Sequence, residues 1–512
     1  MKSSYCLLCL FAKNSRFSAM FLTSLVLTLG NHSVCAGNAT WNLAPTNNDW
    51  NTAANWTPNT VPGEADVATF NTFNITEITF SQESGVLEML FSPGANSFNF
   101  TVSHFQGFTF AIVGLRNNSG VRQDFVADVD VDGKPGFILF EQHSTTSSQT
   151  FFTARPAISA GGSNGSVNFL DFASAGRGTF VNEGAALSGA SGGQTLFFFD
   201  SRGGEGTLIS EGGQVAGGLG GLILFLNHSN AANATLVAEE GIDGGSGGLI
   251  QFLDLSTGDT ARVEVFGNGT LDVSAHTAMS LGSIEGDGLV LLAADKLTVG
   301  SNDLSTIFSG IIKEGGASGG SIVKTGLGTL TLVGASTYAG GTKVTQGILS
   351  ASNTSGSATG TGPVNIDVGT LGGSGIIAGA VVVGTGSGAG AFLAPGIGTN
   401  KQTTLTIQSA LTFNSDATYT DTFKGDKNRV RTDLVTANGV TINGATITIS
   451  SSGQDRIRRG TVLTGISNTS ANPISGTFAN LPDGAIVTVN GNNLQASYSG
   501  GDGNDLTLTV VP

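Results

Sequence analysis

Five phenylalanines recur at an almost constant interval in the first half of this chain. They are Phe140, Phe169, Phe197, Phe225 and Phe252, at intervals of 29, 28, 28 and 27 along the sequence. A period of roughly 20 to 50 residues is typical of solenoids, in which each repeat buries its apolar face by stacking on its neighbours. Because paired strands lie about 4.8 Å apart, we expect the five rings to stack at that distance inside the molecule.

Two further columns keep register with the phenylalanines. A glycine stands four residues before each of them, at Gly136, Gly165, Gly193, Gly221 and Gly248. An apolar residue stands eleven residues after each of them, at Phe151, Phe180, Leu208, Leu236 and Val263. We expect the glycines to allow a tight corner between two faces of the repeat. Three columns in register over five copies indicate one structural unit repeated along the chain.

The composition agrees with stacked strands. Glycine supplies 77 of the 512 residues and proline only 11, while 39% of the residues are hydrophobic and 12% are charged. This chain is too poor in proline to be collagen-like and has enough apolar residues to build a core. Helical patterns are nearly absent. We therefore predict an all-β fold, a right-handed parallel β-helix (β-solenoid) with capped ends and about seventeen coils of roughly 27 residues.

Residues 1–36 have the pattern of a signal peptide. Their positive flank consists of Lys2, Lys13 and Arg16. Residues 17–30 form an apolar stretch that is short for a membrane span, and Val34 and Ala36 suit the small-residue positions before a cleavage site. We expect the mature chain to begin at Gly37 and to be exported, either to the extracellular space or to the cell surface.

The net charge argues against polyanionic partners. The chain carries 22 Lys and Arg against 37 Asp and Glu, a formal charge of −15, and the expected leader holds three of the basic residues and none of the acidic ones. The mature chain would therefore have a charge of −18, which disfavours nucleic acid and anionic membranes as partners. All three cysteines, Cys6, Cys9 and Cys35, lie in the leader, so the mature chain would contain no disulfide.

A second repeat signal lies between residues 321 and 349. Leu330 and Leu332 alternate with threonines, which is the period of a short strand, and we expect two more strands of the same coil at residues 342–346 and 348–350. The segments that carry a family resemblance are Lys324-Thr325-Gly326, Gly328-Thr329-Leu330-Thr331-Leu332, Thr337-Tyr338 and Gly340-Gly341-Thr342. This run resembles the autotransporter-associated β-strand repeat of bacterial surface proteins. The resemblance implies a secreted or cell-surface β-solenoid, of the kind that often carries a C-terminal Pro-Glu-Pro sorting signal.

These signals divide the chain into four parts. Residues 1–36 are the signal peptide, and residues 37–97 form an N-terminal cap and the first coils. Residues 98–281 hold the phenylalanine-bearing repeats of roughly 27–29 residues, and residues 282–512 hold the autotransporter-associated repeat and the C-terminal coils. Such a cap would hold all three tryptophans, Trp41, Trp50 and Trp56. We favour a capping role for their rings over a sugar-stacking platform, because the first coil needs its open edge covered.

A polar column follows the phenylalanines by two residues, at Gln142, Asp171, Phe199, Asn227 and Asp254. One interpretation is a ladder of cation ligands, and the other is a series of turn residues at the ends of strands. Phe199 breaks the ladder and neighbouring carboxylates would repel each other, so we favour the turn.

Two short segments imitate calcium loops. Asp128, Asp130 and Asp132 resemble the start of a helix–loop–helix site, but Leu139 stands where the closing Glu belongs. Residues 500–505, Gly-Gly-Asp-Gly-Asn-Asp, match the opening of a calcium-binding nonapeptide, but only one copy is present. The sequence leaves calcium at either segment open and favours ordinary turns.

The histidines and basic residues do not form a recognisable functional motif. The histidines, His32, His104, His143, His228 and His276, show no metal-ligand spacing. Basic residues cluster only between Lys424 and Arg431 and at Arg456, Arg458 and Arg459, where solvated turns explain them. We therefore predict no catalytic residue, no cofactor-binding residue and no metal ligand.

The sequence favours a non-enzymatic, secreted or cell-surface scaffold or adhesin-like display protein. Its expected partners are extracellular polysaccharide or neighbouring cells. The alternatives are an extracellular polysaccharide-degrading β-helix enzyme (a lyase or hydrolase) and a plain matrix component. The chain shows no segment for a transmembrane barrel, so we expect either release or an anchor encoded after Pro512. The oligomeric state stays open.

Overall fold

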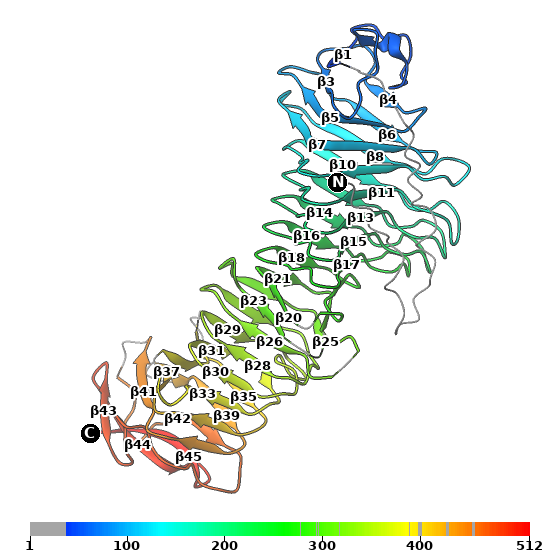
Figure 1. The fold of residues 1–512 in the computed structure, drawn as a ribbon. Helices are drawn as coiled ribbons and strands as arrows, with labels where there is room; N and C mark the ends of the chain where they lie inside the picture. The colour runs from blue at the N-terminus through cyan, green and yellow to red at the C-terminus, as the bar shows by residue number, and fades with distance from the viewer. Residues whose placement is uncertain are drawn as a thin grey trace, which may run out of the picture. The chain divides into compact units, whose positions relative to one another are not determined.

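The computed structural model describes residues 37–512 except 277, 293, 295, 317, 389, 398–401, 426–429 and 453–455. The predicted signal peptide, residues 1–36, lies outside the described residues. Gly37–Pro512 forms one compact unit. Within the described residues, the regular structure consists of strands β1 to β45 and a single 3₁₀ turn, η1 (Ala53–Asn55). Parallel strands stack into a β-solenoid, which confirms the predicted fold class (Figure 1). It has about 15 turns, here called coils, rather than the predicted seventeen or so.

Two long sheets run through the solenoid. The first contains, in spatial order, β2 (Trp56–Thr57), β1 (Ala39–Trp41), β3 (Val67–Phe70), β5 (Ser84–Phe91), β7 (Gly107–Asn117), β9 (Phe137–Phe140), β11 (Ser166–Phe169), β13 (Gln194–Phe197), β15 (Leu222–Phe225), β17 (Leu249–Phe252), β19 (Thr270–Asp272), β22 (Leu289–Leu292) and β25 (Ile311–Glu314). The second contains β4 (Glu77–Thr79), β6 (Asn99–Val102), β8 (Gln123–Ala127), β10 (Thr150–Ala154), β12 (Thr179–Asn182), β14 (Thr207–Ser210), β16 (Thr235–Ala238), β18 (Arg262–Val265), β21 (Ser283–Gly286), β24 (Thr306–Phe308), β27 (Thr329–Leu332), β29 (Ile348–Ala351), β31 (Gly369–Gly373), β34 (Ala391–Ala394), β37 (Ala417–Gly425) and β41 (Thr446–Ser451), with β38 (Val430–Thr432) antiparallel to β37.

Two shorter sheets belong to the C-terminal half. One contains β20 (Ala278–Leu281), β23 (Lys296–Val299), β26 (Ser321–Lys324), β28 (Thr342–Val344), β30 (Val364–Ile366), β33 (Val381–Val383), β36 (Leu411–Phe413) and β40 (Val440–Ile442). The other contains β32 (Ile376–Ile377), β35 (Thr404–Ile407), β39 (Leu434–Ala437), β42 (Val462–Asn468), β45 (Asp505–Val511), β44 (Asn492–Gly500) and β43 (Ile486–Val489).

The five phenylalanines stack through the core as predicted. The ring centroids of successive members are 4.7, 4.7, 4.5 and 4.8 Å apart, because each ring occupies the same position in the next coil. All five side chains are fully buried. A second stack runs beside them through Phe100, Phe125, Phe152 and Phe180, with every separation 4.8 Å. Stacked rings therefore fill the core of the N-terminal coils.

The predicted apolar column is wrong in its first member. Phe152, not Phe151, pairs with Phe180 and is buried. Phe151 points outward, and the guanidinium of Arg122 lies 3.8 Å from its ring centroid. The corner before β10 holds one extra residue, which is why the first interval between the phenylalanines is longer than the second. The structure thus moves the core position by one residue.

The glycine column is required by close backbone packing. A Cβ at Gly193 would lie 1.9 Å from the carbonyl oxygen of Ala154, and one at Gly165 would lie 1.9 Å from that of Ala127. The other three members, Gly136, Gly221 and Gly248, meet the same obstacle at 1.9 to 2.2 Å. None of the five has a positive φ, so the conformational freedom of glycine is not what these positions require. Glycine is required because the neighbouring backbone lies too close to leave room for a side chain.

The polar column consists of turn residues, as favoured. Gln142, Asp171, Phe199, Asn227 and Asp254 all have φ between 53° and 60°. Two of the side chains bond to the neighbouring coil rather than to their own turn. Asn227 Oδ1 accepts a hydrogen bond from the backbone N–H of Phe199 at 3.2 Å, and Asp254 Oδ2 accepts one from that of Asn227 at 3.0 Å. These bonds tie neighbouring corners together.

The autotransporter-like repeat is arranged differently from expectation. The alternation in β27 is confirmed, since Leu330 and Leu332 are buried. However, β29 pairs with β27 in register, Leu330 with Leu349, so these strands lie in successive coils of one sheet and not in one coil. A coil here needs about 20 residues, because it lacks the long glycine-rich corner of the earlier coils.

Both ends of the sheets carry antiparallel strands. At the N-terminal end β2 pairs antiparallel with β1, Trp41 opposite Trp56, and Trp41, Trp50 and Trp56 are all fully buried. Their burial agrees with the capping role and leaves none of the three rings exposed for sugar stacking. At the C-terminal end β43, β44 and β45 form an antiparallel meander on β42. Antiparallel additions of this kind cover edges that would otherwise pair with another chain.

Candidate functional site

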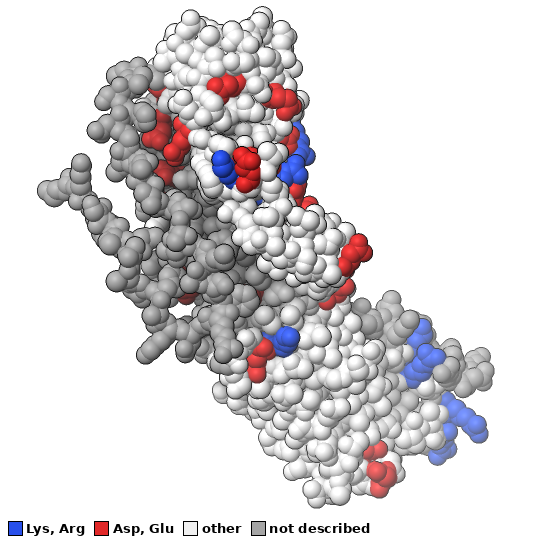
Figure 2. All heavy atoms as spheres, turned by 90° about the vertical axis from the view of Figure 1, so that its right-hand side faces the viewer, with Lys and Arg blue, Asp and Glu red and all other residues white. Residues whose placement is uncertain are grey.

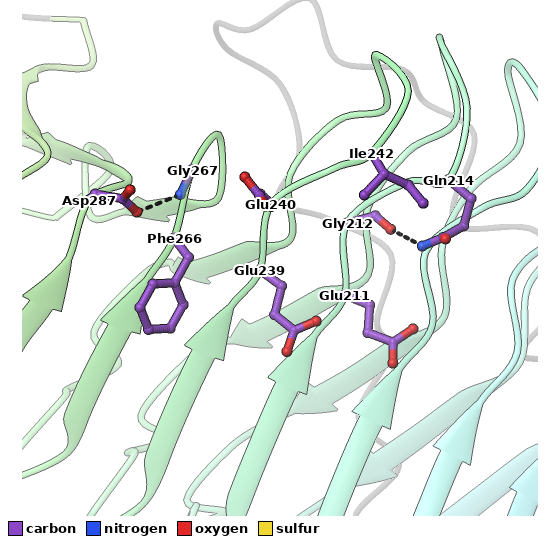
Figure 3. A pocket seen from close by; sticks show the side chains of 9 residues that line it. All are labelled: Glu211, Gly212, Gln214, Glu239, Glu240, Ile242, Phe266, Gly267 and Asp287. Carbon is purple, nitrogen blue, oxygen red and sulfur yellow. Dashed lines mark hydrogen bonds between the residues drawn. The ribbon is translucent and has the colours of Figure 1, made fainter.

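A groove of about 670 Å³ opens beside the ends of β14, β16 and β18. Its lining residues are Glu211, Gly212, Gln214, Glu239, Glu240, Ile242, Phe266, Gly267 and Asp287 (Figure 3). Figure 3 shows Glu211, Glu239 and Phe266 side by side, each just past the end of its strand. Four of the nine lining residues are acidic, namely Glu211, Glu239, Glu240 and Asp287.

The coil repeat itself places these side chains. The backbone N–H of Glu211 donates to the carbonyl oxygen of Asn182 at 2.9 Å, and that of Glu239 donates to Ser210 at 2.9 Å. The N–H of Phe266 makes the same bond to Ala238, also at 2.9 Å. Each residue therefore occupies the same position in its own coil. The resulting column, here called the groove column, runs Arg155, Glu183, Glu211, Glu239, Phe266 and Asp287.

Charge is balanced at only one end of the groove column. Nη1 of Arg155 donates to both carboxylate oxygens of Glu183 at 2.8 Å. Burial, followed by the charges of Glu183 and Glu239, raises the pKa of the Glu211 carboxyl. Burial also raises the pKa of Glu239. Both carboxyls thus bind protons more readily than a free glutamate does.

Both polar and apolar groups line the groove around the two carboxyls. Gln214 Nε2 donates to the carbonyl oxygen of Gly212 at 2.8 Å, and Asp287 Oδ1 accepts from the N–H of Gly267 at 2.8 Å. Phe266 and Ile242 remain 38% and 49% exposed, so they offer apolar surface to a ligand. None of the described lining residues is basic. The groove can accept hydrogen bonds from hydroxyl groups and pack against a flat apolar face.

A second cluster joins two neighbouring corners. His104 lies between β6 and β7, and Asp130 and Asp132 lie between β8 and β9. His104 Nδ1 contacts Asp130 Oδ2, and one ligand atom from each of the three residues lies within 4.8 Å of the others. Asp128, which the sequence grouped with the two aspartates, is not part of this cluster. Asp130 Oδ1 accepts from the N–H groups of Asp132 and Lys134, as expected of a turn.

The other suspected calcium segment forms a hairpin turn. Residues 500–505 connect β44 and β45, and Gly500 pairs with Asp505. Asp505 is buried, and its Oδ1 accepts a hydrogen bond from the backbone N–H of Asn468 at 2.9 Å. That carboxylate therefore serves the fold of the C-terminal meander.

The remaining histidines and basic residues that the sequence singled out do not form a common site. His143 stacks on Phe172 with a centroid distance of 5.3 Å, and His276 Nε2 contacts Ser256 Oγ at 3.2 Å. His228 is exposed, and His32 lies outside the described residues. Arg456, Arg458 and Arg459 are exposed, whereas part of the run from Lys424 to Arg431 lies outside the described residues. Figure 2 shows charged side chains in small separated groups on one mainly uncharged face.

Sequence reasoning missed the groove column and His104, although both left a signal. Glu183, Glu211 and Glu239 recur at the same interval as Phe169, Phe197 and Phe225. His104 and Asp130 are separated in the sequence by close to one coil. Applying the coil period to charged residues as well as apolar ones would have found both.

The sequence analysis also did not predict the buried ionisable groups. Lys324 and Asp421 are each 1% exposed, and Asp433 is equally buried. Lys324 occupies an inward position of the alternating strand β26, where an apolar residue is the rule. These groups bond to main chain or hydroxyls inside the core, so they contribute to the fold rather than to an open site.

The fold and its repeats define the class of protein, which is a parallel β-solenoid. Residues 322–351 match the family model of the passenger-associated-transport-repeat. That match and the solenoid together fit an autotransporter-associated β-strand repeat protein, as the sequence motifs predicted. Such a repeat implies an exported or cell-surface protein. No curated protein matches the chain. Among the described residues, no helix is long and apolar enough to span a membrane.

Proposed function

We propose that this protein is a non-enzymatic, cell-surface β-solenoid that acts as a scaffold and binds neutral extracellular polysaccharide along the groove column. The passenger-type repeat supports display at the surface, and residues 1–36 would direct export. The single observation that carries the binding role is the stacking of Glu211, Glu239 and Phe266 at one residue per coil. A polymer of repeating units would meet similar side chains at regular intervals along it.

The chemistry of the groove selects for uncharged sugars. Carboxylates accept hydrogen bonds from pairs of sugar hydroxyls, and the exposed face of Phe266 can pack against the C–H face of a ring. An anionic polysaccharide would instead meet Glu211, Glu239 and Asp287 with no basic side chain among the described lining residues. Like charges in this groove therefore reject uronates and sulfates.

One observation favours the rival function, a polysaccharide-degrading enzyme. Glu211 and Glu239 lie in neighbouring coils, and both have a raised pKa. Carboxyl pairs with unequal protonation carry out glycoside hydrolysis, with one acting as the acid. In a hydrolase, however, the two groups flank the scissile bond, whereas here they project in parallel from the same edge (Figure 3). This arrangement supports binding over cleavage.

The test is a binding assay of the full chain on neutral and acidic polysaccharides. We expect retention on neutral polymers such as cellulose, xylan or mannan, and none on polygalacturonate or alginate. Phe266→Ala and the double variant Glu211→Gln/Glu239→Gln should each weaken retention at least about fivefold. Matched controls are Phe172→Ala, an exposed ring in another column, and Glu205→Gln, an exposed carboxylate paired with Arg177.

Two outcomes would overturn the proposal. Equal retention of wild type and the groove variants would place the binding surface elsewhere. New reducing ends or unsaturated uronates that disappear in Glu211→Gln would establish the enzyme instead. Retention without product, lost only in the groove variants, supports the scaffold.

A further inference from the structure

We infer that His104, Asp130 and Asp132 form a binding site for a divalent transition-metal ion such as Zn²⁺. The inference is independent of the groove, because the cluster lies on the corners between β6 and β7 and between β8 and β9. One nitrogen and two carboxylate oxygens, all within 4.8 Å of one another, are available as ligands.

The ligand set decides the type of ion. An imidazole nitrogen with two carboxylates suits Zn²⁺ and its neighbours in the first transition row. Calcium prefers six to eight oxygen ligands, and the cluster offers too few. Three protein ligands would leave the fourth position of a tetrahedral ion open to water. The imidazole thus distinguishes this cluster from the purely acidic groove.

The fold orients two of the three ligands in advance. Asp130 Oδ1 is held by the N–H groups of Asp132 at 2.9 Å and Lys134 at 2.8 Å, which leaves Oδ2 facing His104. The N–H of His104 donates to the carbonyl oxygen of Lys134 at 3.2 Å, so the two corners are tied together. Bonds of this kind, one shell out from the ligands, fix ligand orientation at metal centres.

Asp132, the third ligand, would complete the site by a rotation of its side chain. Ligand atoms around a tetrahedral ion lie about 3.3 Å apart, since each bond is about 2.0 to 2.1 Å long. The Asp132 side chain is 67% exposed, and its carboxylate is only 4.0 Å from Lys134 Nζ, a pair too exposed to hold it. It is therefore free to turn toward His104 and Asp130.

The experiment titrates the full chain with Co²⁺, whose visible absorption reports its ligand geometry, and then with Zn²⁺ as competitor. Cys6, Cys9 and Cys35 are changed to serine in every sample, because thiolates would bind both ions. We expect one equivalent of Co²⁺ to bind, Zn²⁺ to displace it, and Ca²⁺ to leave the spectrum unchanged.

The variants are chosen to keep the fold. His104 has a φ of 62°, a conformation that Asn tolerates, so His104→Asn removes the imidazole without straining the turn. Asp130→Asn retains an oxygen for the two backbone donors. Each should reduce the association constant for Co²⁺ at least about tenfold, whereas His143→Asn, an exposed histidine in another corner, should leave it unchanged. Far-ultraviolet circular dichroism checks the fold of each variant.

Two results would contradict the proposed metal site. If His104→Asn and Asp130→Asn bind Co²⁺ as well as wild type does, the ion lies elsewhere. If folded wild type binds no stoichiometric Co²⁺, the cluster is an ion pair between His104 and Asp130 and nothing more. A rise in the thermal midpoint with Zn²⁺ in wild type, absent in both variants, would confirm that the ion links the two corners.

Discussion

Lys324 Nζ donates a hydrogen bond to the carbonyl oxygen of Gly326 at 2.8 Å inside the core of the passenger-type repeat. The same ammonium donates to Thr325 at 2.6 Å and to Gln346 in the next coil at 3.3 Å. A charged side chain in an apolar interior is tolerated only when such partners replace water. Lys324 therefore acts as an internal clamp on three turn carbonyls.

Replacing this lysine should destabilise the protein. Lys324→Met keeps the volume but leaves three carbonyl groups without their donor, so we expect the free energy of unfolding at pH 7 to fall by about 2–4 kcal/mol. The control is Lys343→Met, because Lys343 is exposed and pairs only with Asp367. Urea denaturation measures both. A loss in Lys324→Met of less than about 0.5 kcal/mol, the range of ordinary surface substitutions, would contradict the clamp.

The same lysine should make stability depend on pH in the alkaline range. Burial lowers the pKa of Lys324 to about 8, against 10.5 for a free side chain. Between these values the unfolded chain binds more protons than the folded one, so the free energy of unfolding should rise with pH across that window. The rise should amount to about 3 kcal/mol in wild type and vanish in Lys324→Met. Thermal unfolding at several pH values from about 7.5 to about 10.5 measures the slope.

Asp421 should give the opposite dependence near neutral pH. Burial, together with the charge of Asp433, raises the pKa of Asp421 to about 7, although Thr432 Oγ1 donates to it at 2.9 Å. The folded state then holds the proton more tightly, so this stability is present below pH 4 and is lost as pH rises through 7. Asp421→Asn should be more stable than wild type by about 2–4 kcal/mol at pH 8 and equal to it near pH 4.

The control for that experiment is Asp502→Asn, since Asp502 is an exposed carboxylate in the last hairpin. Its curve should follow that of wild type at every pH. If Asp421→Asn were destabilising at pH 8, the Asp421 carboxylate would have to be stabilised by its surroundings, and the assigned cause of the pH slope would be wrong.

The stacked core should respond strongly to single truncations. Phe197 is fully buried between Phe169 and Phe225, so Phe197→Ala should lower the free energy of unfolding by about 3–5 kcal/mol. Phe199, only two residues away, is 40% exposed, and Phe199→Ala should change it by less than about 1 kcal/mol. Urea midpoints of the two variants provide the comparison. Similar losses would mean that the stack is not the source of stability.

The glycine column offers a test of backbone packing. In Gly193→Ala the new Cβ would lie 1.9 Å from the carbonyl oxygen of Ala154, so the two coils must separate, at a cost of at least about 2 kcal/mol. Gly316 has no neighbour within 4 Å of the equivalent atom, and Gly316→Ala should be neutral or slightly stabilising. Thermal midpoints suffice for this comparison. A neutral Gly193→Ala would show that the corner can relax.

The repeat period of the sequence predicted much of the fold. The intervals between Phe140 and Phe252 predict the stack because a ring can be buried in a solenoid only by recurring once per coil. The sequence did not determine, for every strand, which residue faces the core. Phe151 and Phe152 are both apolar, and only the length of the preceding corner decides which of them faces inward. The short coil between β27 and β29 was likewise hidden, because the pattern of these two strands is compatible with one coil or two.

The sequence by itself determined the repeat, the all-β class, the turn positions and the acidic balance of this protein. Each of these follows from local periodicity, glycine and residue count, which act over one coil or less. Only the tertiary structure decided which charged residues meet. His104 joins Asp130, and Glu211 joins Glu239, because stacking brings residues one coil apart to about 5 Å from each other. The burial of Lys324 and Asp421 was decided in the same way, since their partners come from neighbouring coils or later strands.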